Sequence, residues 1–461
     1  MQQMNFATHS NQFLYGLGLI AGVAALLLFG AAVGLYANRF GEHMVLMLGT
    51  PLLIPLGLLL FVNPRLLFYV LIGTRCALDP VLESARFSSS FGLGALLNML
   101  LVACAVMISI QGDKVRLKQS ILLWALPLLV MVFGVTYAPD TLAALKRLIG
   151  FISYFSVFTI GMILFEEKKL RTLLRVVVMS SALPIAVGLY QFATGSLAAE
   201  GRLAATFTHP NIFAFYCLLV LIALVYLRRT SAGPGESEPG WLESATHSVL
   251  FVLLLVSIVL TQTRSAWVAL TLIALTYGVV FSRKTLLWLF LGLLLAALTP
   301  EVQERIVDLF SGNEVANYGK LNSFAWRQYI WESGLNWMDT SRYLLGYGIG
   351  GFYHYSPEFF PLSGGTHYGA HNVFVERFFD GGVLAVSVFS VFFLVQIQKA
   401  FALIRHDRFT ALVYLGMILS YLTLNASDNV VDYLAYNWYY WAVAGAFYAA
   451  ACQATSSRLR P

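Results

Sequence analysis

Long runs of apolar residues constrain this chain more than any other feature. Of its 461 residues, 59% are hydrophobic and only 11% are charged, whereas a soluble chain is roughly half apolar and a quarter charged. Most runs are about 15–25 residues long, which matches helices that cross a hydrocarbon core about 30 Å thick. The runs lie near 13–37, 43–62, 66–78, 92–110, 120–137, 148–165, 173–192, 210–227, 246–261, 265–281, 285–299, 372–397, 409–425 and 433–452.

These runs predict an all-α, polytopic transmembrane helical bundle of about 12–14 spans, with one large extracytoplasmic loop domain. The run near 66–78 is short enough to be tilted or re-entrant. We expect N-terminal transmembrane helices in residues 1–299, a large loop or cap in 300–371, and C-terminal transmembrane helices in 372–461. The four cysteines lie in apolar runs without CxxC spacing, which indicates neither disulfides nor a metal site.

Basic residues gather in the loops on one side of this predicted bundle. If successive runs alternate across the membrane, that side carries GDKVRLK, EEKKLRTLLR, LRRTSAG, SRK, QKAFALIRHDR and SSRLR. Cytoplasmic loops show such an excess of Lys and Arg, so both termini are expected to be cytoplasmic. This topology accounts for most of the net charge of +6, and we expect no nucleic-acid partner.

The opposite side has short loops and one long segment, residues 300–371. It is rich in tryptophan and tyrosine and contains GYGIGG and SGG. PEVQERIVDLFSG at its start predicts one helix, and SFAWRQYIWESGLNWM predicts a second, amphipathic helix. A segment this long and aromatic is more than a connector, so it is predicted to be a small cap domain on the extracytoplasmic surface.

A few cations break the rule that positive charge lies inside. They are Lys146 and Arg147 in LAALKRLIGF, Arg202 in AAEGRLAATFTHPN, Arg264 in LTQTRSAWVAL and Arg327 in AWRQYIW. A single Arg at the end of a span is commonly a snorkelling anchor. Several separated cations on a sparsely charged face instead favour a shared anionic ligand. A diphosphate suits them, because Arg presents a planar fork of donors to phosphate oxygens.

Histidines lie near these cations, where the chain re-enters the membrane. His371 precedes NVFVERFF, a predicted helix start, and the positive end of a helix disfavours imidazolium. A neutral imidazole can accept a proton, although His371 could instead only cap the loop. His367 lies among glycines, where the backbone is expected to be loose. HxH, HExxH and DxD spacings are absent, so we expect no metal and no cofactor.

A base beside several cations at the outer leaflet suits transfer of a sugar from a lipid diphosphate. The diphosphate leaves readily, so the protein need only stabilise its charge and deprotonate an acceptor hydroxyl. GRLAATFTHPN, TQTRSAWVAL, WRQYIWESGLNW, LLGYGIGGF and AHNVFVERFFDGG occur in this order over roughly residues 140–435. Together they resemble the O-antigen ligase and polymerase superfamily, and within it the lipid A-core:O-antigen ligases.

The resemblance implies a glycosyltransferase of the bacterial inner membrane whose active site faces the periplasm. Its donor would be O-antigen linked to undecaprenyl diphosphate, its acceptor a sugar hydroxyl of lipid A-core, and membrane lipids would surround it. The reaction would be inverting and metal-independent and would serve lipopolysaccharide biosynthesis. O-antigen polymerase and protein O-oligosaccharyltransferase are alternatives, and a transporter of lipid-linked glycan is a further one.

The resemblance also implies roles for individual residues. Arg202 and Arg264 match the arginines that bind the donor diphosphate, and His371 matches the catalytic histidine of the H-N-x-x-x-E motif. Lys146 and Arg147 match a basic pair that assists with the donor. The candidate supporting residues are Arg327, Asn372 and His367.

Overall fold

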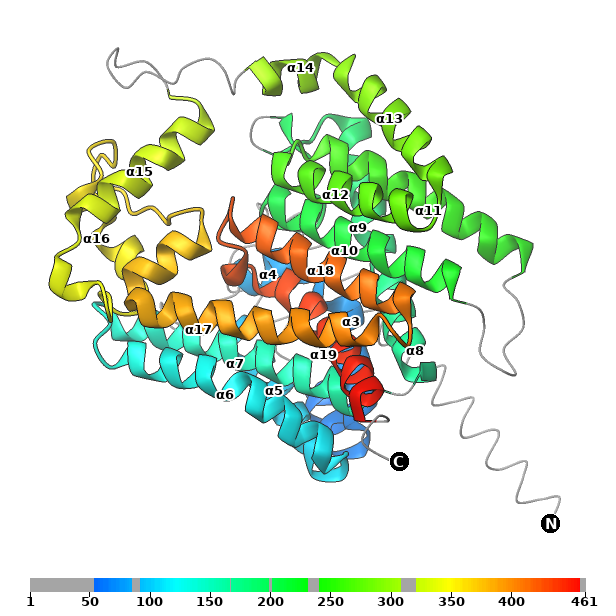
Figure 1. Cartoon of the computed structure of the whole chain (residues 1–461), viewed down its shortest axis with the longest axis horizontal. Helices are drawn as coiled ribbons and strands as arrows, with labels where there is room; N and C mark the ends of the chain where they lie inside the picture. Colours follow the sequence, from blue (N-terminus) through cyan, green and yellow to red (C-terminus); the bar gives the residue numbers. More distant parts are fainter. Residues whose placement is uncertain are drawn as a thin grey trace. The chain divides into compact units, whose positions relative to one another are not determined.

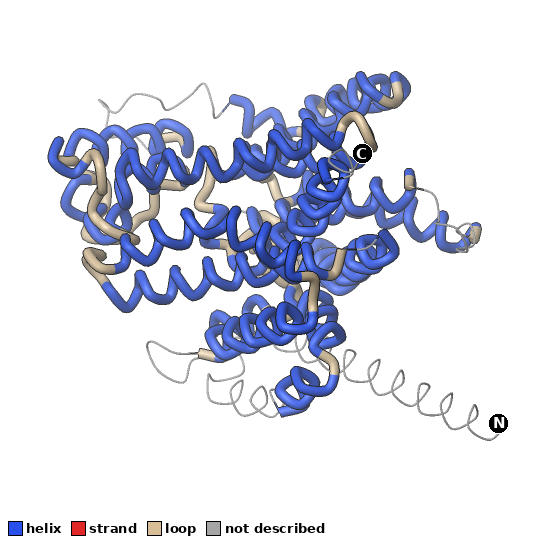
Figure 2. Tube along the Cα trace, turned by 60° about the horizontal axis from the view of Figure 1, so that its bottom comes forward, coloured by secondary structure: helices blue, strands red, loops and turns tan. Residues whose placement is uncertain are grey.

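Helices and loops make up all the structure that is described. The computed structural model describes residues 54–84, 92–165, 167–198, 201–230, 240–307 and 321–456. Within these ranges no strand occurs, and an isolated bridge joins Ala198 and Arg202 (Figure 2). The predicted all-α class is therefore confirmed. The predicted run near 13–37, most of the run near 43–62, residues 231–239 and both termini lie outside the described residues.

Seven of the described helices are long and apolar enough to cross a membrane. This finding confirms a polytopic helical protein, while the total of about 12–14 spans remains a prediction. At about 1.5 Å per residue, the 12 residues of α3 (Pro64–Arg75) cover only about 18 Å, so this helix is too short to span alone. The seven helices cover Leu93–Gln111, Lys114–Val135, Thr141–Ile163, Leu170–Thr194, Pro210–Arg229, Trp241–Leu260 and Val373–Leu403.

The chain divides into two compact units that interleave along the sequence. Unit 1 comprises Met1–Gln111 and Glu167–Thr261, and unit 2 comprises Gly112–Glu166 and Gln262–Pro461. The helices of unit 1 after α3 are α4 (Asp79–Ser84), α5 (Leu93–Gln111), α8 (Glu167–Ser180), α9 (Ala182–Thr194), α10 (Pro210–Arg229) and α11 (Trp241–Leu260).

Helix α10 is the buried centre of unit 1, since most of its residues are inaccessible to solvent. It begins at Pro210, whose fixed φ and missing N–H suit a first helical turn, and the His209 ring accepts a hydrogen bond from the Asn211 N–H at 3.1 Å. Upstream, the carboxylate of Asp79 accepts hydrogen bonds from the backbone and hydroxyl of Thr208. The last residues of the loop that precedes α10 are therefore held by side-chain contacts.

Unit 2 contains the remaining helices, which Figure 1 labels. Glycines let α7 (Thr141–Ile163) and α19 (Leu434–Ser456) approach closely. A Cβ on Gly161 of α7 would clash with the Ala442 carbonyl, and one on Gly445 of α19 would clash with the Phe158 carbonyl. Its helices are α6 (Lys114–Val135), α7 (Thr141–Ile163), α12 (Arg264–Val280), α13 (Arg283–Ala297), α14 (Pro300–Val307), α15 (Ser323–Trp337), α16 (Gly351–Phe359), α17 (Val373–Leu403), α18 (Arg408–Asn425) and α19 (Leu434–Ser456), with 3-10 turns η3 (Thr340–Arg342) and η4 (Val430–Asp432).

The predicted cap contains α14, α15 and α16. The second expected helix forms as α15, and the first forms over α14, while the rest of its predicted range lies outside the described residues. Its described part has a core of aromatic rings, in which Phe352 and Phe359 pack against Phe379 at the start of α17. The glycine-rich turn docks on the same helix, because Gly346 has φ +67° and lies so close to the backbone of Asp380 that no Cβ would fit. The cap thus rests on the N-terminal end of α17.

The two ends of the unit 2 bundle differ in charge. The cap, the start of α7, the start of α17 and η4 meet at one end, through contacts such as that between Nη2 of Arg147 and Oδ2 of Asp432 at 3.8 Å. At the other end Arg116, near the start of α6, donates to the carbonyl of Phe165 beyond the end of α7. The predicted basic loops GDKVRLK and QKAFALIRHDR belong to this second end.

This arrangement makes the predicted orientation testable with engineered cysteines. Thr366 in the cap and His406 between α17 and α18 are both exposed, and the four native cysteines are buried. We expect a membrane-impermeant maleimide to label a Thr366→Cys variant in intact spheroplasts. A His406→Cys variant should react only after lysis. The reverse pattern of labelling would overturn the orientation.

Candidate functional site

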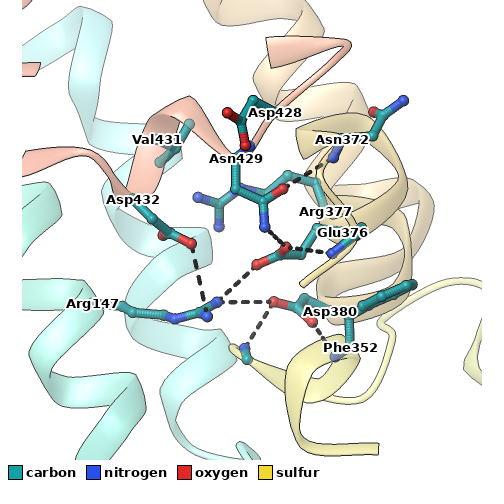
Figure 3. Close-up of polar contacts among 12 residues, drawn as sticks. Arg147, Phe352, Asn372, Glu376, Arg377, Asp380, Asp428, Asn429, Val431 and Asp432 are labelled. Atoms are coloured by element: carbon teal, nitrogen blue, oxygen red, sulfur yellow. Dashed lines mark hydrogen bonds and ion pairs between the residues drawn. The ribbon is translucent and has the colours of Figure 1, made fainter. Parts of the chain in front are cut away.

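An ionic cluster with two buried carboxylates joins α7, α17 and η4 at the capped end of unit 2 (Figure 3). Nη1 of Arg147, on α7, lies 2.9 Å from Oε1 of Glu376 and 3.9 Å from Oδ2 of Asp380, both on α17. Its Nη2 lies 3.8 Å from Oδ2 of Asp432 in η4. One guanidinium therefore faces three carboxylates, and it provides the positive charge that lets them sit together.

Glu376 connects this cluster to the segment that precedes α17. Its Oε2 accepts hydrogen bonds from Nδ2 of Asn429 at 2.5 Å and from the backbone N–H of Ala370 at 3.4 Å. Oδ1 of Asn429 in turn accepts from the N–H of Asn372 at 3.0 Å (Figure 3). The residues on both sides of His371 are thus fixed by polar contacts.

Asp380 connects the same cluster to the cap. Its two carboxylate oxygens accept hydrogen bonds from the backbone N–H groups of Gly350 at 2.8 Å and Phe352 at 2.9 Å. These N–H groups belong to the start of α16, where a carboxylate is favourable beside the helix N-terminus. The cap is therefore oriented by the carboxylate that also faces Arg147.

His371 lies immediately before the N-cap of α17, as the sequence predicts. The cap is Asn372, whose side chain accepts from the N–H groups of Phe374 and Val375. Nδ1 of His371 lies 3.1 Å from Oδ1 of Asp428, and the side chains of the two residues are 40% and 1% exposed. A buried carboxylate in this position favours the tautomer with the proton on Nδ1, which leaves Nε2 able to accept a proton.

Asp428 is itself held by two further donors. Its Oδ1 accepts from the N–H of Asn429 at 2.9 Å, and its Oδ2 accepts from the hydroxyl of Tyr433 at 2.7 Å. Burial, and then the charge of Asp428, raise the pKa of Tyr433, so this phenol remains a donor. Sequence analysis missed both residues because it followed cations. The available signal was NASDNVVDY, an acidic turn between two apolar runs on the sparsely charged side.

Helix α15 brings two predicted arginines toward His371. Nη1 of Arg264 lies 3.5 Å from the hydroxyl of Ser323, the first residue of α15. Arg327 follows four residues later, so it occupies the same face of that helix. The ring of Trp326 packs 6.0 Å from the ring of His371. Within the described part of the chain, Arg327 forms no ion pair.

Arg202 belongs to unit 1 and is described separately. Its Nε donates to the carbonyl of Thr261 at 2.9 Å, and its Nη2 donates to Oδ1 of Asn211 at 2.6 Å. The loop beyond it contains Ala205, whose N–H and carbonyl are both bonded by the side chain of Gln191 at 2.9 and 3.0 Å. Arg202 is thus held by a loop with a fixed backbone.

Backbone strain marks the segments that carry the predicted residues. Among the described non-glycine residues, positive φ occurs at Ala205 (52°), Gln262 (51°) and His371 (49°). The first two lie within three positions of Arg202 and Arg264. This left-handed conformation costs roughly 1–2 kcal/mol per residue, and such strain concentrates at functional sites. The coincidence makes each of these segments a candidate for a functional role.

The remaining predicted residues are placed differently from expectation. His367 was expected to be loosely held, yet its Nδ1 lies 3.0 Å from the carbonyl of Tyr353 and its ring stacks on that residue at 5.3 Å. Helix α16 therefore fixes His367 despite the glycines around it. Lys146 is exposed on α7, whereas its neighbour Arg147 points into the carboxylates.

Comparisons with known proteins agree with the resemblance seen in the sequence. Residues 249–390 match the family model described as O-antigen ligase. The ComP-specific O-oligosaccharyltransferase of Acinetobacter baylyi (strain ATCC 33305 / BD413 / ADP1) is 34% identical over 85 residues, which are 18% of this chain and 14% of that protein. The matched segment covers a small share of that relative. The family match confirms the predicted resemblance and supports a glycosyltransferase-type enzyme.

The ionic cluster predicts that loss of Arg147 lowers the stability of the protein, which differs from a loss of affinity for the glycan donor. Arg147→Met should lower the free energy of unfolding by about 3–5 kcal/mol, because it leaves buried carboxylates unpaired. Lys146→Met, a matched change at an exposed neighbour, should shift it by less than about 0.5 kcal/mol. Unfolding in detergent measures both. If Arg147→Met keeps full stability and loses only donor affinity, Arg147 binds substrate instead.

Proposed function

We propose that this protein is an inner-membrane glycosyltransferase that transfers O-antigen from undecaprenyl diphosphate to a sugar hydroxyl of lipid A-core, in lipopolysaccharide biosynthesis. The observation that carries the proposal is the contact between His371 and Asp428. It supplies an oriented general base next to arginines, and His371 lies within the segment that matches the O-antigen ligase family. An inverting, metal-independent transfer needs such a base and a cationic site for the leaving diphosphate.

In the proposed reaction, Nε2 of His371 takes the proton of the acceptor hydroxyl. The acceptor oxygen forms a bond to the anomeric carbon of the donor as the bond between that carbon and the phosphate oxygen breaks. The diphosphate leaves with the electron pair of the broken bond. The carboxylate of Asp428 stabilises the imidazolium that forms and keeps the ring in one orientation.

Arginines are proposed to stabilise the charge that develops on the diphosphate. Arg264 and Arg327 are the candidates in unit 2, because Arg264 contacts the start of α15, and that helix carries both Arg327 and the Trp326 that packs against His371. Arg202 is the candidate in unit 1. Arg147 has less support as a donor ligand, since three carboxylates already surround its guanidinium. We assign Arg147 a structural role in the site. The exposed Lys146 is then the candidate on α7 for binding the glycan donor.

The proposed active site faces the periplasm, and both termini are cytoplasmic. The support is the charge difference between the two ends of unit 2, since loops rich in Lys and Arg remain in the cytoplasm. A transporter would instead place its cations along a path through the middle of the membrane, commonly on broken helices. Arg264 lies at the start of α12 and Arg327 in the cap, which favours an enzyme.

A protein O-oligosaccharyltransferase is the second candidate, because the matched Acinetobacter protein bears that description. An O-antigen polymerase would use the same donor with a growing glycan as acceptor. The decisive assay combines purified protein and lipid-linked donor, in EDTA, with lipid A-core, a pilin-like protein or a second lipid-linked repeat. Product on lipid A-core alone supports the proposal, and product on either other acceptor alone overturns it in favour of that candidate.

The base assignment predicts a difference between the two neighbouring histidines. His371→Ala should lower turnover by roughly 10²–10⁴-fold, the usual range for loss of an acid–base group, with donor affinity nearly unchanged. His367→Ala is the matched control and should cost much less. Ligation rates and donor binding should be measured for both variants. Normal ligation by His371→Ala, or a defect mainly in donor binding, would make His371 structural.

The diphosphate assignment predicts that lysine cannot replace the arginines. Arg202→Lys and Arg264→Lys should both lose ligation, because a point charge lacks the planar fork that bonds two phosphate oxygens. An arginine that only anchors the protein at the membrane surface would tolerate lysine. Donor affinity measured alongside ligation separates the two roles. Full ligation in both lysine variants excludes the diphosphate assignment.

A further inference from the structure

We propose that Tyr433 is a positioning residue for the base, acting through Asp428 on His371. This inference rests on the proposed function, because it extends the proton-accepting pair to a third side chain. Asp428 and Tyr433 lie five residues apart in the connection between α18 and α19, and His371 lies in the segment before α17. The packing of α17 against α18 and α19 brings His371 to the other two residues.

The hydrogen bonds form a continuous chain. The hydroxyl of Tyr433 donates to Oδ2 of Asp428 at 2.7 Å, and Oδ1 of the same carboxylate lies 3.1 Å from Nδ1 of His371. Asp428 is buried, so an oxygen without a donor would be costly there. The phenol satisfies one oxygen and thereby directs the other toward the imidazole.

Tyr433 is held rigidly enough to perform this role. Its N–H donates to the carbonyl of Val430 at 3.0 Å, and its own carbonyl accepts from both the backbone N–H and Nδ2 of Asn437 at 3.0 Å. The backbone on both sides of the phenol is therefore fixed. A side chain mounted in this way can set the direction of the carboxylate it contacts.

Other charged groups surround the pair and remain present in the test. Arg327 on α15 lowers the pKa of Tyr433, and Asp432 in η4 raises it, while both act less strongly than burial and Asp428. Glu376 on α17 and Arg147 on α7 face the same region from the other side. None of these groups changes when the phenol alone is removed.

Removal of the phenol should shift the pH dependence of the rate in a predictable direction. A carboxylate that loses a hydrogen bond keeps more of its negative charge for its remaining partner, so it stabilises the imidazolium form of His371 more strongly. The acid limb of the rate profile, where the base becomes protonated, should then move to higher pH in Tyr433→Phe. Asp428→Asn removes the negative charge and should move the same limb to lower pH.

The experiment measures ligation against pH for wild type, Tyr433→Phe, Asp428→Asn and Tyr440→Phe. Tyr440 is the matched control on α19, because its buried hydroxyl has no hydrogen-bond partner within the described residues. Tyr433→Phe should lower turnover roughly threefold to thirtyfold and move the acid limb to higher pH by about 0.5–1 unit. Both effects are of the size expected for the loss of about one hydrogen bond. Tyr440→Phe should leave the profile in place.

Two outcomes overturn the inference. Lower turnover of Tyr433→Phe without a shift of the acid limb means that Tyr433 only supports the fold, and an unchanged rate means that it has no role. A thermal unfolding scan of each variant separates loss of folded protein from loss of rate. Normal ligation by His371→Ala in the same assay would refute the proposed function itself. Loss of ligation in His371→Ala without the expected shift in Tyr433→Phe would refute only the role of Tyr433.

Discussion

The guanidinium of Arg147 is the interaction on which the capped end of unit 2 depends. It faces carboxylates from α17 and η4, and the two carboxylates of α17 also bind other segments of the chain. Glu376 holds the residues beside His371, and Asp380 holds the start of α16. Without a positive charge at the centre these groups could not be buried together, since unpaired buried charges cost several kcal/mol each.

The arrangement of residues at the start of α17 follows from this ionic constraint. Asn372 caps the helix, and His371 must then turn away in a left-handed conformation with φ of 49°. That conformation is unfavourable for a residue with a side chain, and it persists because contacts on both sides fix the backbone. The same constraint aims the imidazole at Asp428. Packing, capping and the orientation of the proposed base are therefore one structural feature.

Sequence patterns predicted the elements better than the contacts between them. Apolar runs gave the helical class, and SFAWRQYIWESGLNWM gave α15 with nearly correct bounds. Local rules also placed His371 before a helix start. They could not find Asp428, because it lies 57 residues away and meets His371 only through the packing of α17 and α18. They misjudged His367 for the same reason: Tyr353 restrains it through tertiary contacts that glycine content does not reveal.

The arginines of unit 2 divide into two kinds once their partners are known. Two negative charges 4 Å apart repel by about 4 kcal/mol at an effective dielectric constant near 20, so a diphosphate cannot approach bare carboxylates. Arg147 faces the carboxylates near His371, which would lower that repulsion in the proposed site. Arg264 contacts Ser323 at the start of α15, the helix that also carries Arg327. In the proposed function, Arg147 thus makes the site tolerable for an anion, and Arg264 and Arg327 are the candidates that bind it.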